Sequence, residues 1–447
     1  MTAKPMFSNR ALTALAVPIV LEALLAIMAG LVDTAMVSSA GEAAVGAISL
    51  VDSVNLLFIY VFSAIANGGA VVTAQYIGSK NLLSAKTSAN QLLYAASGVS
   101  LVLMAVLLCF VQPILNLIYP GIAPDVFQNA HVYFFYTLLG YPFFAVGNAC
   151  TALLRSMAKS RLALFIALSS NIFNVIGNAI LIYGFDLGAA GAAISTTVSR
   201  VLWAAAGLYF LHNKDLPVHL EKLLSFRFDW DIMRRIMLIG SANGVESGLF
   251  QVGKVLVSSL IASFGTIATA AYSVSYTICS VGWNTVGAIG TVLLTVVGQC
   301  MGAGETEQAK HYTKKLTWFA YGMVLVLFGS IFLFRNQLVG LFSFSNEAKT
   351  ASVYYTAVGV LCTVFSVYAW SFVPVNAFRA SGETRYSMIL AIVSMFTFRV
   401  GLSYVLGAWM QLGLLGVWIG MWADWACRSV FNSIHFKRGK WLQRKLI

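Results

Sequence analysis

Charge is scarce in this sequence. Only 10% of its 447 residues are Asp, Glu, Lys or Arg, whereas 59% are hydrophobic and the mean hydropathy is +0.81. Soluble domains carry about 25% charged residues, so a soluble protein of this composition could not cover its own surface. A disordered chain is excluded as well, because too many apolar side chains require burial. Lipid is therefore the expected solvent.

Several motifs of catalysis and cofactor binding are also missing. The six cysteines contain no C-x-x-C pair, the five histidines show no H-E-x-x-H spacing, and no G-x-x-x-x-G-K-[ST] loop occurs. We expect no disulfides, no enzymatic activity, no cofactor and no ATP-driven transport. No metal site is expected beyond a possible Na⁺ site.

Twelve apolar runs are long enough to cross a bilayer. A crossing needs about 20 residues as a helix, and the runs are continuous rather than alternating, which favours helices over a β-barrel. The stretch after Lys4 and Arg10 is too long for a cleavable signal, so we expect the first span to remain. The predicted spans are 11–38, 46–75, 88–118, 127–154, 162–184, 187–211, 233–264, 267–300, 312–341, 351–377, 386–408 and 412–436.

Lys and Arg residues lie mostly on one side of these spans. Of 28, 22 fall at the termini or in the loops that join even to odd spans, including Lys222, Arg444 and Lys445. Two fall in the opposite loops and four within spans. The positive-inside rule then places both termini in the cytoplasm. The net charge of +12 is thus explained by membrane orientation, and we expect no nucleic-acid partner. We predict a monomer in a bacterial inner membrane.

The chain repeats itself at an offset of 224 residues. Gln75-Tyr-Ile-Gly78 recurs as Gln299-Cys-Met-Gly302, and other positions correspond at the same offset: Glu22 with Glu246, Arg155 with Arg379, Arg161 with Arg385. Six spans are an even number, so the two halves share one orientation. We predict an all-α integral membrane protein with twelve transmembrane helices in two six-helix lobes, related by pseudo-two-fold symmetry along the membrane normal. The lobes are residues 1–211 and 232–447, and 212–231 is a cytoplasmic linker.

Several segments resemble those of a known family. The first span reads AVPIVLEALLAIMAGLVDTAMVSSAG, the second ends in VVTAQYIG, and the fifth and sixth read NIFNVIGNAILIYGFDLGAAGAAISTTVS. The loops ALLRSMAKSR and NAFRASGETR occupy equivalent places in the two halves. Together these segments resemble the multidrug and toxic compound extrusion (MATE) transporters. The resemblance implies export of organic, often cationic, compounds driven by inward flow of Na⁺ or H⁺.

Carboxylates within the spans are the candidate coupling groups. Each costs several kcal/mol at membrane depth unless it is paired, hydrated or protonated. Asp33 matches the acidic residue in the first span of the family. Glu22 lies eleven residues earlier, almost three helical turns, and so points the same way. The alternative is that one of them pairs with a buried cation such as Arg200.

An asparagine stripe in the fifth span suggests ligands for a cation. Asn171, Asn174 and Asn178 lie on one helix face. Amide oxygens are hard, neutral ligands that suit Na⁺. The resemblance places Asn174, Asn178 and Thr196 around Asp33. Hydrogen bonding between helices is the alternative role.

The C-terminal half offers one further candidate, Glu246, the repeat partner of Glu22. It matches an acidic residue in the seventh span of one branch of the family, but that branch also has an Asp in span 10, where this chain has none. Glu246 could titrate, attract a cationic substrate, or pair loosely with Lys254. Asp424 and Arg428, four residues apart, are predicted to form an ion pair.

Aromatic side chains in span 8 are candidates for a substrate cleft. Tyr272, Tyr276 and Trp283, with Asn284, could hold a lipophilic cation against flat π-faces. Cation-coupled export of small organic molecules is the predicted function. The alternatives are a lipid-linked precursor flippase, which needs a strongly cationic cavity, and an intramembrane enzyme.

Overall fold

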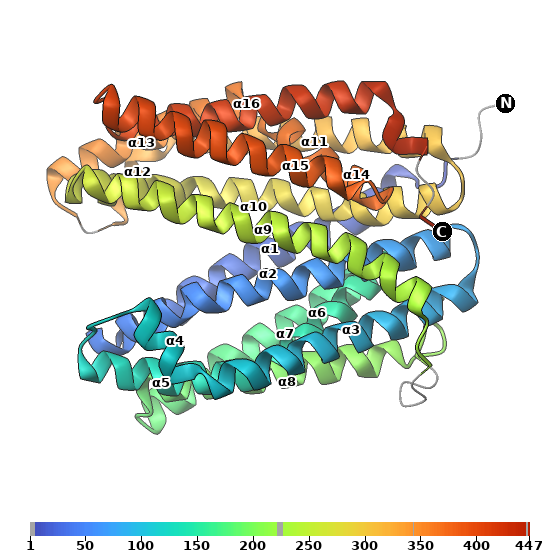
Figure 1. Ribbon diagram of the computed structural model, residues 1–447, viewed down its shortest axis with the longest axis horizontal. Helices are drawn as coiled ribbons and strands as arrows, with labels where there is room; N and C mark the ends of the chain where they lie inside the picture. Colours follow the sequence, from blue (N-terminus) through green and yellow to red (C-terminus); the bar gives the residue numbers. More distant parts are fainter. Residues whose placement is uncertain (1–4, 221–226, 343, 444–445) are drawn as a thin grey trace. The chain divides into compact units, whose positions relative to one another are not determined.

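The computed structural model describes residues 5–220, 227–342, 344–443 and 446–447 (Figure 1). Lys4, Lys222, Arg444 and Lys445 lie outside the described residues, and so does part of the predicted linker, 221–226. In the described ranges every regular element is a helix.

The first half holds nine helical segments. They are α1 (Asn9–Ser38), α2 (Glu42–Gly78), α3 (Leu82–Cys109), α4 (Val111–Ile118), α5 (Pro124–Leu139), α6 (Tyr141–Ser156), α7 (Ser160–Asn178), η1 (Ala179–Gly184) and α8 (Gly188–Leu211).

The second half follows the same order. Its segments are α9 (Trp230–Ser263), α10 (Thr266–Gly302), α11 (Thr306–Leu333), α12 (Arg335–Gly340), α13 (Asn346–Phe365), α14 (Tyr368–Ala380), α15 (Thr384–Ser394), η2 (Met395–Leu402), η3 (Tyr404–Trp409), α16 (Leu414–Arg438) and η4 (Lys440–Gln443).

The internal repeat is visible in the helix boundaries. α2 and α10 begin and end at positions exactly matched by the 224-residue offset, and so do α3 and α11. The short α4 has its counterpart in α12, and the segment η1 that follows α7 has its counterpart in η2 and η3. Because the same sequence pattern gives the same elements twice, the repeat predicted from the sequence is a structural one.

The helices are long and apolar enough to cross a membrane. Among the described residues nine helices meet that test, and two bent pairs, α5 with α6 and α13 with α14, bring the number to eleven. α16 has 25 residues, about 37 Å of helix, and so also exceeds the bilayer core. With α16, the twelve predicted spans are confirmed as twelve helical crossings.

Two predicted spans are bent rather than straight. α5 and α6 meet at 46°, next to Gly140 and Pro142, and α13 and α14 meet at 52°. In the second pair the bend follows Val367, whose φ of 52° takes the backbone out of the helical region. No proline or glycine stands at that break, so no residue type there predicts a bend.

Contacts divide the chain into two units, each described here by itself. One is Asn9–Gly244, the other Val245–Ile447 with the segment that contains Met6 and Phe7. In the first unit α2 packs against α3, α5 and α6, while α1 packs against α7. In the second, α10 takes the place of α2 and packs against α11, α13 and α14. The predicted lobe and linker boundaries stay a prediction.

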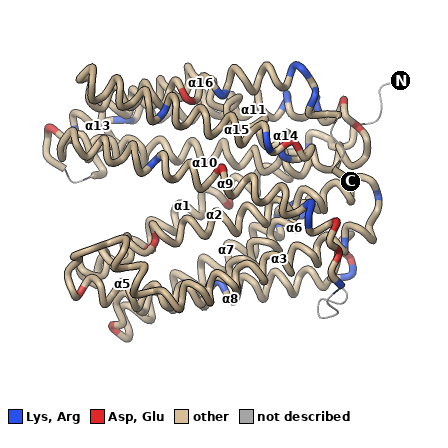
Figure 2. Tube along the Cα trace, in the orientation of Figure 1, with Lys and Arg blue, Asp and Glu red and all other residues tan. Residues whose placement is uncertain are grey.

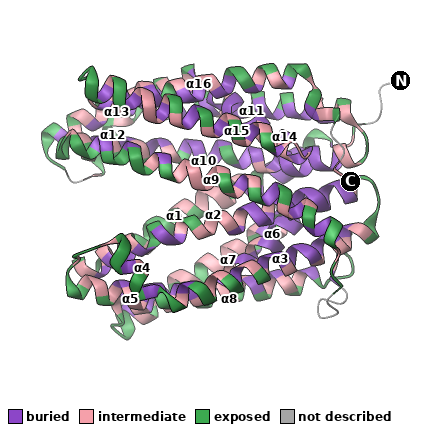
Figure 3. Ribbon diagram, viewed as in Figure 1, coloured by how far each residue is buried: buried purple, intermediate pink, exposed green. Residues whose placement is uncertain are grey.

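The outer helix faces carry apolar side chains. Val102, Val326 and Phe365 are 63%, 70% and 71% exposed (Figure 3). Lys and Arg are sparse along the helices and more frequent near helix ends (Figure 2). Apolar exposure on this scale suits a lipid-facing surface.

Candidate ion-coupling site

Asp33 connects α1 to α7. The Asn178 side-chain amide donates a hydrogen bond to Asp33 Oδ1, which joins α1 to α7. Asn178 is fully buried and Asp33 is half-buried. The position is therefore inside the first unit, where a carboxylate is retained only with a partner or a visiting cation.

Asn174 lies one turn before Asn178 and ties α7 to α8. Its side-chain amide donates to Thr196 Oγ1 at 3.3 Å, and Ser195 Oγ donates to the Asn174 carbonyl at 2.8 Å. This close approach requires Gly177, because a Cβ there would collide with the Ser195 side chain. Asp33, Asn174, Asn178 and Thr196 are thus brought into one cluster from three helices.

One hydrogen-bond acceptor in this cluster has no donor. Asn178 Oδ1 is buried and has no hydrogen-bond partner among the described residues. Buried polar atoms are normally paired, so an orphaned oxygen beside a carboxylate calls for an explanation. Hard cations take carboxylate and amide oxygens as ligands, so Asn178 Oδ1 and Asp33 offer such a cation two suitable oxygens.

A second polar network in the same unit joins Asp52, one of the carboxylates within the spans, to tyrosines that the sequence did not single out. The Tyr133 hydroxyl donates to Asp52 Oδ1 at 3.2 Å, and the Tyr141 hydroxyl donates to Asn55 Oδ1 at 2.8 Å. Tyr133 and Tyr141 flank the bend between α5 and α6. Only the i, i+3 spacing of Asp52 and Asn55 could have pointed to this network.

Arg200 belongs to that second network rather than to Glu22. Its Nη1 donates to the Thr137 carbonyl at 3.4 Å, and the guanidinium lies 5.3 Å from the Phe144 ring centre. Arg200 is close enough to Asp33 and Asp52 for electrostatic attraction, although neither forms a recorded ion pair with it. The two carboxylates therefore share one nearby cation.

Glu22 and Glu246 form the same ion pair in the two halves. Glu22 binds Arg155, and Glu246 Oε2 lies 2.8 Å from Arg379 Nη2. Both partners differ from those considered from the sequence, which were Arg200 and Lys254. Lys254 instead lies 5.4 Å from the Tyr276 ring centre. Because both acids and both arginines are related by the repeat, the pair is a duplicated feature of the fold.

The predicted pair of Asp424 and Arg428 is confirmed. Arg428 Nε donates to Asp424 Oδ1 at 2.8 Å, and Arg399 Nη1 lies 3.9 Å from Asp424 Oδ2. All three side chains are almost fully buried. Arg428, Glu246 and Arg379 also line a cavity of about 200 Å³ in the second unit.

The cluster around Asp33 has no polar counterpart in the second half. The repeat places Val257, Phe398 and Leu402 where Asp33, Asn174 and Asn178 stand, and, after one inserted residue, Met421 where Thr196 stands. In the second unit Asp424 faces two buried arginines, Arg399 and Arg428, and Glu246 pairs with Arg379. Its electrostatics therefore disfavour a cation, whereas those of the first unit favour one.

The aromatic candidates of α10 form a chain of ring contacts. Tyr272 and Tyr276 are 5.5 Å apart between ring centres, and Tyr276 and Trp283 are 5.2 Å apart. Trp283 is buried and donates to Thr363 Oγ1 at 3.1 Å, which places it in the packed interior of the unit. Asn284 is exposed and its amide donates to the Ser280 carbonyl. Their role in a substrate cleft stays a prediction.

Comparison with known proteins connects this architecture to transporters. The family model described as MatE matches residues 18–180 and 244–405. The chain is 26% identical to the "Uncharacterized transporter YisQ" of Bacillus subtilis, over 99% of this chain and 97% of that protein. It is 25% identical to the "Probable multidrug resistance protein NorM" of Thermotoga maritima, over 98% and 94%.

A solved structure shows the same fold. The "Crystal structure of MATE in complex with MaL6" superposes with a TM-score of 0.91 at 20% identity, and the match covers 98% of this chain and 97% of that one. The two matched segments of the family model fall in the two halves of the internal repeat.

Proposed function

We propose that this chain, which belongs to the MatE family of membrane transporters, exports organic cations by antiport with Na⁺ or H⁺. Members of this family are transporters and not enzymes, and the relatives named multidrug resistance proteins support a multidrug efflux role. The expected partners are small lipophilic cations and the bilayer. We propose that the protein works as a monomer in a bacterial inner membrane, without a cofactor.

The observation that carries the coupling proposal is the pairing of Asp33 with Asn178. Asp33 accepts from a neutral amide and forms no ion pair within the described part of the chain, so its charge is left for a cation or proton to neutralise. The orphaned Asn178 Oδ1 supplies a second oxygen. Asn174 lies one turn from Asn178 and donates to Thr196 on α8, which adds two uncharged polar side chains to the cluster. We assign ion coupling to this cluster.

Glu22 and Glu246 are weaker candidates for the same role. Each already has an arginine partner, so its charge is compensated whether or not an ion is present. Export follows if ion binding at Asp33 and substrate binding favour opposite arrangements of the protein, since a ligand shifts a conformational equilibrium only by its differential affinity.

A flippase for lipid-linked pyrophosphates is not favoured. Such a protein needs free cations in its interior. Of the four cations in the spans, Arg399 and Arg428 bind Asp424, Arg200 binds a backbone carbonyl, and Lys254 lies against Tyr276.

Transport in proteoliposomes tests the proposal. The purified protein is reconstituted with ethidium outside or inside the vesicles, and a Na⁺ gradient or a pH gradient is imposed separately. One of the two gradients should drive ethidium against its own gradient, and collapsing that gradient with an ionophore should stop the movement. Ethidium movement that is indifferent to both gradients contradicts antiport.

A further inference from the structure

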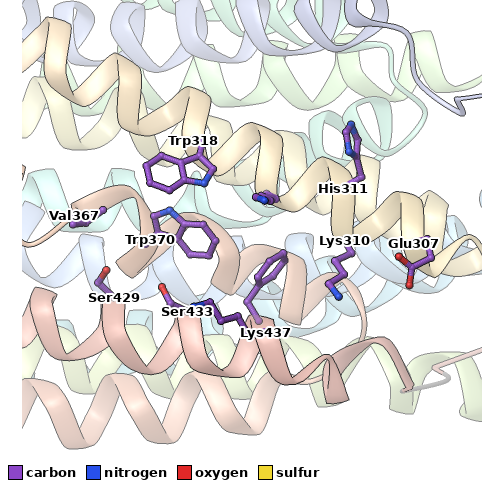
Figure 4. Close-up of a pocket in the computed structure, with 11 residues that line it drawn as sticks. Glu307, Lys310, His311, Trp318, Val367, Trp370, Ser429, Ser433 and Lys437 are labelled. Carbon is purple, nitrogen blue, oxygen red and sulfur yellow. The ribbon is translucent and has the colours of Figure 1, made fainter.

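A cavity of about 670 Å³ lies among α11, α14 and α16, outside the coupling site (Figure 4). Its lining includes three lysines and a histidine, and also two tryptophans and a valine. The lining residues are Glu307, Lys310, His311, Lys314, Trp318, Val367, Trp370, Ser429, Ser433, Phe436 and Lys437.

The cavity is polar at one end and aromatic at the other. Lys310 and Trp318 lie two turns apart on α11, about 12 Å along the helix axis. In Figure 4, Lys310 and Glu307 occupy one end, while Trp318, Trp370 and Val367 occupy the other. The rings of Trp318 and Trp370 are 5.9 Å apart between centres. A cavity with charged residues at one end and aromatic residues at the other suits an amphiphile with a charged head and an apolar tail.

The charge of the polar end is positive and uncompensated. Lys310, Lys314 and Lys437 take part in no ion pair recorded among the described residues, and Glu307 is the single acidic side chain in the lining. Two of these lysines are one turn apart on α11, and Lys437 comes from the last turn of α16. An anion is therefore the favoured ligand at this end.

A buried donor at the cavity wall also lacks an acceptor. Trp370 is 8% exposed, and its Nε1 has no hydrogen-bond partner within the described part of the chain. Trp370 also follows Val367, whose positive φ turns the backbone at the break that opens this space. Buried indole N–H groups usually find a partner, so a ligand with acceptor oxygens would satisfy it.

The internal repeat provides independent support. At the 224-residue offset, Glu307, Lys310, His311, Lys314 and Trp318 of α11 correspond to Leu83, Lys86, Thr87, Asn90 and Tyr94 of α3. Those α3 residues line an equivalent pocket, of about 550 Å³, in the first unit.

In the first unit a later segment of the chain borders that pocket. His219, Arg227, Phe228 and Asp229 complete the pocket, and Gln91 Nε2 donates to the Arg227 carbonyl at 2.6 Å. The second half has no such segment in the cavity lining: after α16 the described chain turns away, and Trp441 packs against Phe378 and Phe436. The lining of the α11 cavity thus comes from α11, α14, α16 and Val367, whereas residues that follow α8 supply part of the lining of its counterpart.

We propose that this cavity binds an anionic phospholipid at the membrane surface, with the phosphate at Lys310, Lys314 and Lys437 and an acyl chain along Trp318 and Trp370. Basic pockets between membrane helices are suited to anionic lipid head groups. The interface is also where tryptophans gather. Trp370 Nε1 donates to an ester oxygen of the lipid, where the head group joins the acyl chain.

Lipid titration of the intact protein tests this site. Detergent-purified protein is titrated with phosphatidylglycerol, phosphatidylcholine or inorganic phosphate, and bound lipid is counted by native mass spectrometry. Phosphatidylglycerol should bind at least about tenfold more tightly than phosphatidylcholine, since each lysine near an anionic lipid contributes about fivefold. Equal binding of the two lipids contradicts the proposal, and displacement by inorganic phosphate identifies a free-phosphate site instead.

Matched variants locate the binding. The change K310Q/K314Q/K437Q should lower phosphatidylglycerol affinity at least about tenfold. The control K80Q/K159Q/K214Q removes the same charge from exposed positions of the first unit and should leave the affinity unchanged. W370F keeps an aromatic ring but removes the donor, and should weaken binding about threefold. Equal losses in the two triple variants would place the lipid elsewhere.

Folding and function are monitored in the same variants. Lys314 is exposed, so the single change K314E preserves a folded protein if the triple variant does not accumulate. It should lower phosphatidylglycerol affinity on its own, and an unchanged affinity contradicts the proposal. Ethidium transport by the Asp33 site is measured separately, so that failure of the lipid site and failure of the antiport proposal are distinguishable.

Discussion

Asp33 illustrates how a single side chain acquires a role from its surroundings. The chain has carboxylates at Glu22, Asp33, Asp52, Glu246 and Asp424 at membrane depth, and the structure sorts them by partner. Three bind arginine, Asp52 accepts from a tyrosine and from an asparagine amide, and Asp33 accepts only from the amide of Asn178 among the described residues. The acid with the least compensated charge is the one best suited to exchange a cation or proton.

Replacing Asp33 with Asn should abolish coupled efflux while the protein still folds. The change removes the charge to which the coupling ion binds but leaves a side chain of the same shape, so we expect the free energy of unfolding to change by about 1 kcal/mol or less. Ethidium transport against its gradient measures the loss. D125N, at an exposed position in the same unit, is the control and should transport normally. Uphill transport by D33N at the wild-type rate would transfer the coupling role to another acid, with Glu246 first.

Replacing Asn178 with Ala should weaken ion coupling without eliminating it. The change removes the orphaned Oδ1 and the donor to Asp33, but keeps the carboxylate itself. Loss of a residue that orients an ion ligand lowers affinity about tenfold or more. The concentration of Na⁺ or H⁺ that gives half-maximal ethidium efflux should rise accordingly. N129A, at a half-buried position of α5, serves as the control, and an unchanged ion dependence in N178A contradicts a ligand role.

At the scale of elements, the two Glu–Arg pairs join the first helix of each half to a bent helix. Glu22 lies on α1 and Arg155 at the end of α6, and Glu246 on α9 pairs with Arg379 at the end of α14. Side chains in both pairs are 14–20% exposed, so they are largely withdrawn from water. Breaking one partner leaves an uncompensated charge, which costs more than the pair itself contributes.

The single variants E22Q and E246Q should therefore each destabilise the protein, by about 2 kcal/mol, and the doubles E22Q/R155Q and E246Q/R379Q should recover most of that loss. Thermal unfolding in detergent measures all four. Because the repeat duplicates the pair, the two halves should respond alike. If ethidium efflux keeps its ion dependence in both double variants, the two ion pairs have a structural role. Loss of that dependence in E22Q/R155Q would show that Glu22 takes part in ion coupling.

The helices follow from the sequence more closely than the site does. Continuous apolar runs and a 224-residue repeat are long-range patterns, so twelve crossings could be predicted without knowledge of packing. The bend at Val367 could not, because it depends on a backbone conformation that no proline or glycine announces.

The site depends on tertiary neighbours in the same way. The sequence identified Glu22 and Arg155, and their repeat partners, as matched positions, yet it did not show that each acid pairs with that arginine. Tyr133 and Tyr141 were missed because tyrosines are common in membrane helices and their partners, Asp52 and Asn55, lie on another helix. Asn178 was predicted as a site residue because Asn171, Asn174 and Asn178 recur at helical spacing.

At the scale of the whole molecule, charge sets the orientation in the membrane, and orientation sets the direction of transport. The loops expected in the cytoplasm hold most of the Lys and Arg, and Arg335 and Lys349 are the two in the opposite loops. Moving a lysine or arginine out of the cytoplasmic leaflet works against the positive-inside rule, so we predict that both termini are cytoplasmic. Inward flow of the coupling ion then drives substrate outward.

Cysteine labelling in intact cells tests this orientation. In a background without the native cysteines, D125C lies in the first turn of α5 and F228C next to the start of α9, where Phe228 is 60% exposed. Asp229 is kept, because its side chain accepts from the Ile232 N–H at the start of α9. A membrane-impermeant maleimide should label D125C from outside and should reach F228C only after the cells are permeabilised. The opposite pattern would reverse the orientation, and the transporter would then import what it is proposed to export.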